Sequence, residues 1–326
     1  MCKSVFYVGV DVGKDEVWAS MDGYRPRSFK NTPGGAKALR EWSRKVSPDQ
    51  TIHFCMEATG VYGRSLAVRL LSFADTETSV VNPAQINSYA KAQLRRSKTD
   101  SVDSRVILSF AQTQKPHPWK PEPEAIRKLY QLVSQADVLE QQIQDWANRQ
   151  HAHSHASDLP KEIRNCDKAL QRTLKRQLEK IEKAIDQLLE EDSGLSERVD
   201  LLCSFKGIAK KSAVRIIGYS RDAMTERSAK ALVAHAGLAP RHHQSGTSVH
   251  ARSHIAKQGD KRLRKALYMP ALVAMVHNPV IRNFYQRLLQ NGKAKKLAIT
   301  ACMKKILVIL RAMIKTNKPF NPNINA

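Results

Sequence analysis

Four acidic residues have the types and spacing that a metal-binding site requires. Asp11 and Glu57 each end an apolar run that favours a β-strand, at a position where a core residue would otherwise be expected. Asp100 and Asp103 are three residues apart in a helical pattern, so they share one face, where like charges repel unless a cation lies between them. Asp11 and Glu57 could instead be turn residues, and Asp100 could simply favour the start of a helix capped by Thr99. Neither explanation covers Asp103.

The chemistry of these four side chains favours a hard divalent cation. Carboxylate oxygens suit Mg²⁺, and no set of cysteines and histidines competes with them for a softer metal. Two such cations held roughly 4 Å apart by shared carboxylates stabilise the attacking and leaving oxygens of a phosphoryl displacement. The four acids therefore predict Mg²⁺ as the cofactor, with two ions per site, and a phosphodiester as the substrate.

The chain is strongly basic, and its charge is unevenly placed. Its 326 residues carry a net charge of +24 and a pI near 10.0. Of the 54 lysines and arginines, 24 lie between Leu201 and Ala326, where only three acidic residues accompany them. Such an excess predicts a polyanionic partner, and nucleic acid is the commonest. The residues that we expect to contact nucleic acid are Lys206, Lys210, Lys211, Arg241, Arg252, Lys257, Arg262 and Arg264.

Composition also excludes several classes of protein. No run of about 18 apolar residues is present, so no membrane-spanning helix is expected. The first residues alternate like a strand and lack the apolar stretch of a signal peptide. The five cysteines are scattered and odd in number, which argues against a disulfide framework and a structural zinc site. We therefore expect a cytoplasmic protein without a membrane partner.

The apolar pattern divides the chain into three regions and a linker. Residues 1–118 predict an α/β domain with a mixed central sheet flanked by helices, because strand patterns come first and then alternate with helical ones. The proline-rich residues 119–123 predict a linker. Residues 124–195 carry two long helical patterns whose apolar steps of three and four predict a coiled coil that pairs protomers. Residues 196–326 predict a basic, mostly helical domain.

A tract with His151, His153 and His155 falls between the two long helical patterns. A polar loop is the simpler interpretation, because no cluster of cysteines or carboxylates accompanies the histidines, as a metal site would require. The sequence does not assign this tract a role.

Several short motifs together resemble the DEDD transposases of bacterial insertion sequences. Within them, the chain is similar to the bridge-RNA-guided serine recombinases, which are related to Piv-type DNA invertases. The motifs of the first region are Gly9-Val10-Asp11-Val12-Gly13-Lys14, Met56-Glu57-Ala58-Thr59-Gly60, Asn82-Pro83 and Lys98-Thr99-Asp100-Ser101-Val102-Asp103-Ser104-Arg105. The motifs of the last region are Ala236-Gly237-Leu238-Ala239-Pro240, Gln244-Ser245-Gly246-Thr247-Ser248, Ile255-Ala256-Lys257-Gln258-Gly259 and Leu263-Arg264-Lys265-Ala266-Leu267-Tyr268. Their order and joint spacing carry the resemblance along the whole chain.

The resemblance implies a RuvC-like (ribonuclease-H-type) domain, then a coiled coil, then a transposase domain. It assigns the DEDD quartet to Asp11, Glu57, Asp100 and Asp103, and the nucleophile to Ser245. It implies that strand cleavage leaves a covalent phosphoserine, and that a non-coding guide (bridge) RNA pairs with donor and target DNA. It also implies homodimers that join into homotetramers and that act at the bacterial nucleoid.

Other interpretations stay open at the level of sequence. A Ser-Gly pair such as the one at Ser245 is most often a turn, and Ser248 lies on the same loop as a rival nucleophile. Tyr268 and Tyr285 would serve a tyrosine-type mechanism. A hydrolytic RuvC-like nuclease would keep the quartet without a covalent intermediate. An actin-like sugar kinase or ATPase would share only the strand-Asp-x-Gly motif at Asp11, and a non-catalytic DNA-binding protein would use the acids as structural caps.

Overall fold

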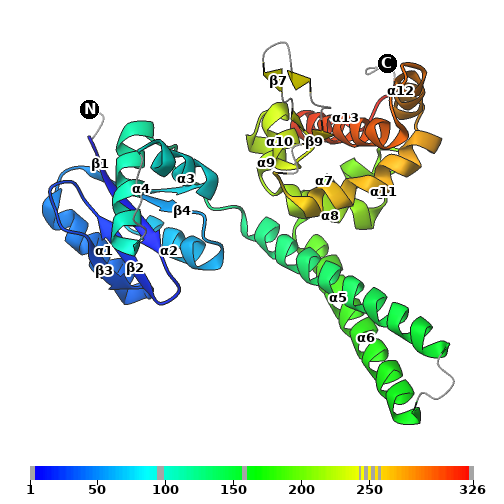
Figure 1. Ribbon diagram of the computed structural model, residues 1–326, viewed down its shortest axis with the longest axis horizontal. Coiled ribbons are helices and arrows are strands. Elements are labelled where there is room, and N and C mark those ends of the chain that lie inside the picture. The colour runs from blue at the N-terminus through cyan, green and yellow to red at the C-terminus, as the bar shows by residue number, and fades with distance from the viewer. Residues whose placement is uncertain are drawn as a thin grey trace. The chain divides into compact units, whose positions relative to one another are not determined.

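The computed structural model describes residues 4–93, 99–155, 160–241, 244–245, 249–250, 254–255 and 258–322. They belong to two compact units, Met1–Pro121 and Glu122–Ala326. Figure 1 shows the elements of each unit along the chain.

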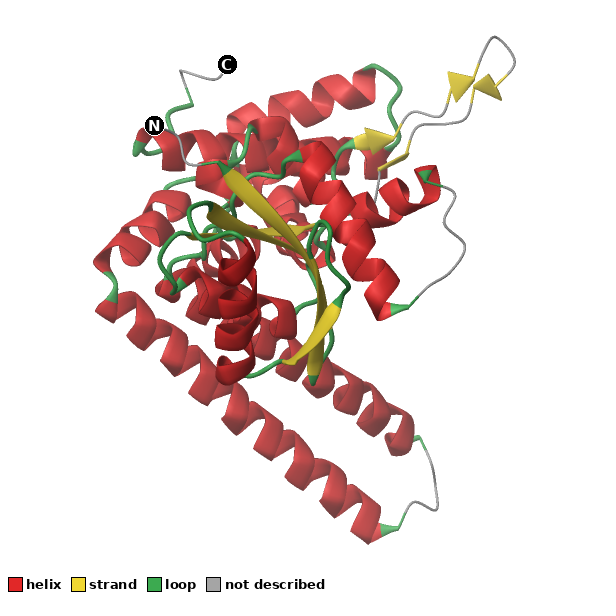
Figure 2. Cartoon of the chain, turned by 90° about the vertical axis from the view of Figure 1, so that its left-hand side faces the viewer, coloured by secondary structure: helices red, strands yellow, loops and turns green. Residues whose placement is uncertain are grey.

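The first unit is built on a five-stranded mixed sheet with the strand order β3-β2-β1-β4-β5 (Figure 2). The strands are β1 (Val5–Val12), β2 (Glu16–Ser20), β3 (Arg27–Lys30), β4 (Thr51–Glu57) and β5 (Thr76–Val81). β1 and β2 pair antiparallel, as do β2 and β3, whereas β4 lies parallel to both β1 and β5. The predicted α/β class with a mixed sheet is confirmed.

Helices cover both faces of this sheet because successive strand residues point to opposite faces. Val10 and Phe54 pack with Leu39 of α1 (Pro33–Val46) and Leu66 of α2 (Val61–Leu71). On the other face, Cys55 joins a cluster with residues of α3 (Pro83–Ala92) and α4 (Asp100–Gln114). Residues at the carboxyl ends of β1 and β4 that point away from α1 and α2 therefore face α3 and α4.

The second unit begins with two long helices, α5 (Glu124–Ser154) and α6 (Lys161–Glu191). They run antiparallel beside each other (Figure 1), and buried leucines and isoleucines of both helices, such as Leu129 and Leu188, belong to one core cluster. The predicted apolar seam therefore joins two helices of the same chain.

The histidine tract differs from the loop that the sequence predicts. α5 continues through His151 and His153 to Ser154, and the His153 ring lies 2.8 Å (Nδ1 to Oδ2) from the buried Asp167 of α6. Histidine is tolerated on a helix, and the His153 ring has a carboxylate partner there, so the polar composition of the tract did not end the helix.

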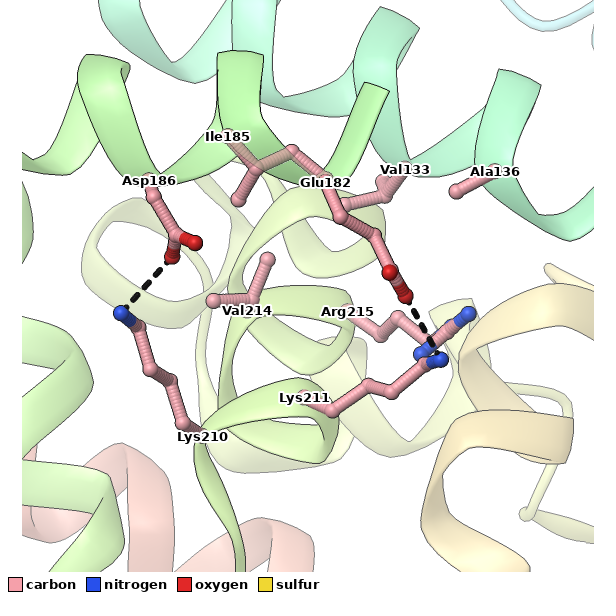
Figure 3. Close-up of a pocket in the computed structure, with 9 residues that line it drawn as sticks. All are labelled: Val133, Ala136, Glu182, Ile185, Asp186, Lys210, Lys211, Val214 and Arg215. Atoms are coloured by element: carbon pink, nitrogen blue, oxygen red, sulfur yellow. Dashed lines mark hydrogen bonds and ion pairs between the residues drawn. The ribbon is translucent and has the colours of Figure 1, made fainter. Parts of the chain in front are cut away.

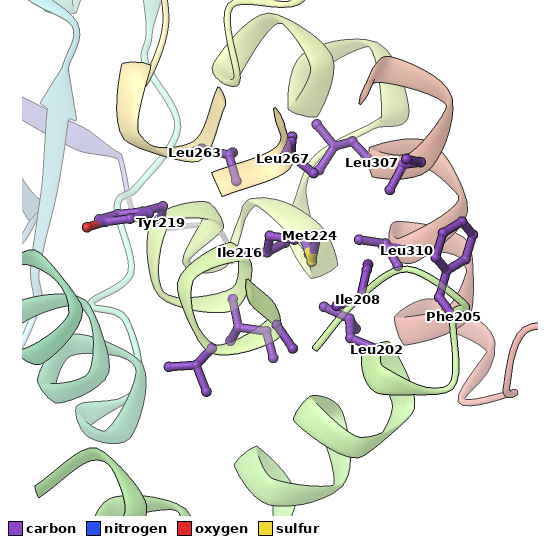
Figure 4. Packing of buried hydrophobic residues seen from close by; sticks show 14 of the residues in the cluster. Leu202, Phe205, Ile208, Ile216, Tyr219, Met224, Leu263, Leu267, Leu307 and Leu310 are labelled. Atoms are coloured by element: carbon purple, nitrogen blue, oxygen red, sulfur yellow. The ribbon is translucent and has the colours of Figure 1, made fainter. Parts of the chain in front are cut away.

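The rest of the second unit is mostly helical, as predicted. Its helices are α7 (Ser193–Cys203), α8 (Lys210–Ser220), α9 (Ala223–Glu226), α10 (Ala229–His235), α11 (Lys261–His277), α12 (Pro279–Gln290) and α13 (Lys295–Thr316). Figure 4 shows their shared core, in which Phe205, Leu267 and Leu310 are fully buried. Four short strands, β6 (Pro240–Arg241), β7 (Gln244–Ser245), β8 (Val249–His250) and β9 (His254–Ile255), form two pairs, β6 with β9 and β7 with β8.

Candidate active site

Asp11 and Glu57 lie next to each other at the ends of two parallel strands. Val10 of β1 is opposite Met56 of β4, so the next residue of each strand is Asp11 and Glu57. Because Val10 and Met56 point into the α1 and α2 side of the core, the two acids point to the α3 and α4 side. Both carboxylates are half-buried.

A glycine lets α4 approach this strand closely. A Cβ atom at Gly9 would overlap the backbone nitrogen of Leu108 and the carbonyl oxygen of Ser104. The buried Ser104 hydroxyl also lies 2.7 Å from the Ser20 hydroxyl on β2. These contacts fix the first half of α4 against β1 and β2, and so fix the residues that α4 presents to the sheet edge.

Asp100 and Asp103 occupy the first turn of α4. The Thr99 hydroxyl accepts a hydrogen bond from the Val102 N–H (3.4 Å), so the predicted cap is present. Free N–H groups and the helix dipole stabilise negative charge in this turn, which allows two carboxylates to stand one turn apart. The helix therefore presents both acids at the end where β1 and β4 present theirs.

All four acids line one cleft of about 460 Å³. The sequence predicted this grouping from residue types alone, and the structure brings together the four side chains from β1, β4 and α4. The cleft also has polar members that the sequence analysis missed, Glu16 of β2 and Asn87 and Lys91 of α3. Glu16 could have been found from the alternation of Glu16, Trp18 and Ser20 along β2, which places them on one face.

Burial and the neighbouring carboxylates raise the affinity of Asp11 for a proton. The pKa of Asp11 rises from its ordinary 3.8 to about 6, first because the side chain is partly buried and then because Asp100, Asp103 and Glu57 are negatively charged. A hydrogen bond from the backbone N–H of Val12 lowers this pKa but does not offset the other effects. Ionisation of Asp11 is therefore unfavourable in the metal-free cleft.

The donor set fits a hard cation, although the ligands are not gathered around one point. Four carboxylates that face one cleft provide only oxygen donors, the type that Mg²⁺ prefers. In the described part of the chain, however, no three acidic, histidine or cysteine side chains converge closely enough to hold one ion. Binding of a cation would need the side chains of Asp11, Glu57 and the α4 acids to turn toward one another.

Ser245, the serine that the resemblance assigns as nucleophile, is the last residue of β7. Its backbone pairs with Val249 of β8, so it stands beside the connection between two antiparallel strands. Ser248 and the side chain of Ser245 lie outside the described part of the chain. The structure thus places the backbone of this serine at a hairpin connection.

The basic residues predicted to contact nucleic acid have different surroundings. Lys210 lies 2.8 Å (Nζ to Oδ1) from Asp186, and Lys211 lies 2.7 Å from Glu140 and 2.9 Å from Glu182. Both lysines line a cavity of about 260 Å³ between α5, α6 and α8, which Figure 3 shows. The charged side chains that line this cavity all form ion pairs with one another or with neighbouring acids of α5 and α6. These ion pairs connect α8 to the two long helices.

The other predicted basic residues are partly described. Arg262 stacks over the rings of Tyr130 and Tyr219, and the Arg264 guanidinium donates to the carbonyl oxygen of Ala236 at 3.1 Å. Lys206 is exposed. The side chains of Arg241, Arg252 and Lys257 lie outside the described residues.

The two tyrosines considered as rival nucleophiles also differ from each other. Tyr268 is exposed on α11, whereas Tyr285 on α12 packs partly buried against the core of the second unit. Neither lines the cleft of the four acids.

Two family models match the chain. The model of the DEDD transposase of IS110, described as a transposase, matches residues 8–154, and the model described as "Transposase IS116/IS110/IS902 family" matches residues 199–286. The first match contains the cleft of four carboxylates, and the second contains β7 and α11.

Individual relatives extend this similarity over the full length. The chain is 33% identical over 329 residues to the pilin gene-inverting proteins of Moraxella bovis and Moraxella lacunata, and the alignments cover 98% of this chain and 98% of each relative. It is 30% identical over 115 residues to the IS110 uncharacterized 43.6 kDa protein of Streptomyces coelicolor, which covers 35% of this chain and 28% of that protein.

These matches and the acidic cleft define an enzyme of DNA recombination and transposition. The chain belongs to the IS110/IS116/IS902 family of transposases. Among the described residues, no helix is both long and apolar enough to cross a membrane.

Proposed function

We propose that this protein is a recombinase that cleaves and rejoins DNA strands through a covalent bond to Ser245 and thereby moves an insertion sequence. The observation that carries the proposal is the single cleft lined by Asp11, Glu57, Asp100 and Asp103. The similarity to pilin gene-inverting proteins supports inversion of a DNA segment as a second outcome of the same chemistry.

The first unit supports a RuvC-like (ribonuclease-H-type) catalytic domain. A RuvC-like domain is supported by the antiparallel β1–β2–β3 meander that is followed by the parallel strands β4 and β5. It is also supported by the acids at the ends of β1 and β4 and on α4. Mg²⁺ bound by Asp11, Glu57, Asp100 and Asp103 would offset their repulsion and supply positive charge to a phosphodiester. The carboxylates themselves would orient that cation and exclude a DNA phosphate in its absence.

The covalent step is a transesterification, in which one phosphate ester bond replaces another. The Ser245 hydroxyl oxygen forms a bond to the phosphorus, and the bond from phosphorus to the 3′ oxygen of the DNA breaks. The leaving 3′ oxygen gains a proton and the serine hydroxyl loses one, so a 5′ phosphoserine and a free 3′ hydroxyl result. Attack by a 3′ hydroxyl on that phosphoserine reverses the step and joins strands without an external energy source.

The proposed partners are donor and target DNA and a non-coding guide RNA. The net charge of +24, concentrated in the last third of the chain, supports a nucleic-acid partner, and the motif resemblance supports a guide RNA. On the same resemblance we propose that the protein forms homodimers that join into homotetramers. We also propose that it acts at the nucleoid, in the bacterial cytoplasm. The apolar seam between α5 and α6 is used within the chain, so association would depend on the outer surface of these helices.

The metal-dependent part of the proposal is tested by removing single carboxylates. Asp11→Ala and Asp103→Ala should abolish strand cleavage in Mg²⁺ while nucleic-acid affinity, measured by filter binding, stays within about twofold, because the basic surface is unchanged. Asp49→Ala, which removes an exposed acid outside the cleft, is the matched control and should cleave normally. Full recombination by either cleft variant would exclude the metal-site role.

A further inference from the structure

A groove beside α11 combines exposed apolar side chains with positive charge. It has a volume of about 500 Å³ and lies between α11, the start of α13 and the chain after α10. The residues that line it are Leu238, Lys261, Arg264, Lys265, Tyr268, Met269, Thr300 and Met303. None of them belongs to the acidic cleft.

The helical period of α11 separates this groove from the core. Leu263 and Leu267 are fully buried and point into the cluster of the second unit, where Figure 4 shows them near Leu307. Lys261, Lys265 and Tyr268 follow each other at steps of four and three, which places them together on another face. The sequence therefore uses one face of α11 for packing and another for the groove.

Large apolar side chains on that second face are left in solvent. The Tyr268 side chain is 46% exposed and that of Met269 is 60% exposed, although buried core residues flank them in the sequence. An exposed tyrosine ring beside a polarisable thioether offers a flat apolar surface, which an unstacked base can cover.

The charge of the groove fits a polyanion. Lys261, Arg264 and Lys265 contribute three positive charges, and none of the described residues that line the groove is acidic. The neighbouring acid, Asp260, caps the start of α11 through the N–H groups of Arg262 and Leu263 and lies 3.5 Å from the Arg262 guanidinium. In the part of the chain that the structure describes, no ion pair uses Lys261 or Lys265, so their charge is available to phosphate.

We infer that this groove binds an unpaired DNA strand, with a base stacked on Tyr268 and Met269 and its phosphates beside Lys261 and Lys265. The combination of an aromatic platform with cations is the chemistry that binds single strands without reading sequence. The inference rests on the proposed function, because strand exchange separates duplex DNA and leaves unpaired segments to be held. We propose a DNA strand and not an RNA strand as the ligand, because DNA recombination is the activity that the family membership supports.

The test compares the affinity of the full chain for a fluorescent oligothymidine strand and for a duplex of equal length, without divalent metal. Tyr268→Ala should weaken single-strand binding about tenfold, the loss of one base stack, and leave duplex binding nearly unchanged. Tyr268→Phe should bind like the wild type, because it keeps the ring. Tyr24→Ala removes a tyrosine of similar exposure, 51%, outside the groove and should have no effect.

The lysines provide a second, independent readout. Lys265→Ala should weaken single-strand binding and reduce its dependence on salt concentration, whereas Lys180→Ala on α6 removes the same charge outside the groove and should change neither. Because the assay needs neither metal nor cleavage, its failure and the failure of the proposed chemistry are distinguishable.

Four outcomes would overturn the inference. They are an unchanged single-strand affinity of Tyr268→Ala, an equal loss on duplex DNA, a loss confined to an RNA strand, and a change of oligomeric state by sedimentation. The third would assign the groove to RNA and the fourth to a second copy of the chain.

Discussion

At the scale of single residues, ionisation of Asp11 carries an electrostatic cost in the cleft. Its pKa of about 6 lies above the ordinary 3.8, so the folded protein favours the protonated acid. The stabilisation that this gives is complete below the ordinary pKa and is lost as the pH rises through about 6. In metal-free protein at neutral pH, the ionised Asp11 therefore lowers the free energy of unfolding.

Asp11→Asn should consequently stabilise the metal-free protein. The full shift corresponds to about 3 kcal/mol, but the side chain is half-exposed and solvent screens the charges, so we expect on the order of 1 kcal/mol. Calorimetry in a chelator should show a higher melting temperature for the variant near pH 8 and almost no difference near pH 4.

Asp49→Asn, an exposed acid outside the cleft, should change the melting temperature little at either pH. A destabilised Asp11→Asn protein near pH 8 would mean that a positive group of the chain already balances the carboxylate.

The sequence predicted the four acids as site residues for a physical reason that the other polar residues of the cleft do not share. Asp11 and Glu57 end apolar strands, and Asp103 lies beside Asp100 on one helix face, so each is unusual in its local pattern. Lys91 is an exposed polar residue in an ordinary position, and only the packing of α3 brings it to the cleft. Glu16 had a weak signal, because the alternation along β2 places it on one face with Trp18.

At the scale of elements, the cleft depends on how closely α4 lies against β1. Gly9→Ala should force the two backbones apart, since the new methyl group would overlap the backbone of Leu108 and Ser104. We expect a loss of about 2–3 kcal/mol in the free energy of unfolding, together with a loss of cleavage because Asp100 and Asp103 move with α4.

Gly34→Ala is the matched control for this substitution. It lies in the first turn of α1 with open space around its Cα, so alanine should be neutral or stabilise by up to about 1 kcal/mol. Urea unfolding followed by circular dichroism measures both variants. A Gly9→Ala protein as stable as the wild type would contradict the close approach of α4.

The seam of the long helices gives a second prediction at this scale. Leu139 of α5 is only 6% exposed, so Leu139→Ala should cost about 3 kcal/mol, whereas its neighbour Val138, 49% exposed, should tolerate alanine. Thermal unfolding and sedimentation measured together separate two roles. Loss of association without loss of stability would place Leu139 between protomers.

The periodicity of apolar residues predicted these helices, but the expectation that their seam pairs protomers differs from the structure, in which α5 and α6 of one chain share it. A stripe at steps of three and four shows that a helix is buried on one side, and it is the same whether the partner is α6 of the same chain or a second protomer. The end of α5 was missed because the polar residues near His153 look alike on an exposed helix face and in a loop.

At the scale of the whole molecule, the residues of the proposed chemistry lie in two different compact units. The four carboxylates belong to Met1–Pro121, and Ser245 belongs to Glu122–Ala326. The motif resemblance predicted both halves, whereas composition predicted only that the last third would meet a polyanion. A serine in a hairpin has no local signal of reactivity, which is why the residue pattern alone left Ser248, Tyr268 and Tyr285 open.

The most direct test of the account is to trap the protein on nicked DNA in Mg²⁺, denature it and identify the linked peptide by mass spectrometry. We predict that the wild type is joined to a DNA 5′ end through Ser245, that Ser245→Ala loses the adduct while still binding DNA, and that Ser248→Ala keeps it. An adduct on Ser248 or on a tyrosine would contradict the assigned nucleophile. Strand cleavage by Ser245→Ala without any adduct would show that water attacks the phosphate and that the enzyme is a hydrolytic nuclease.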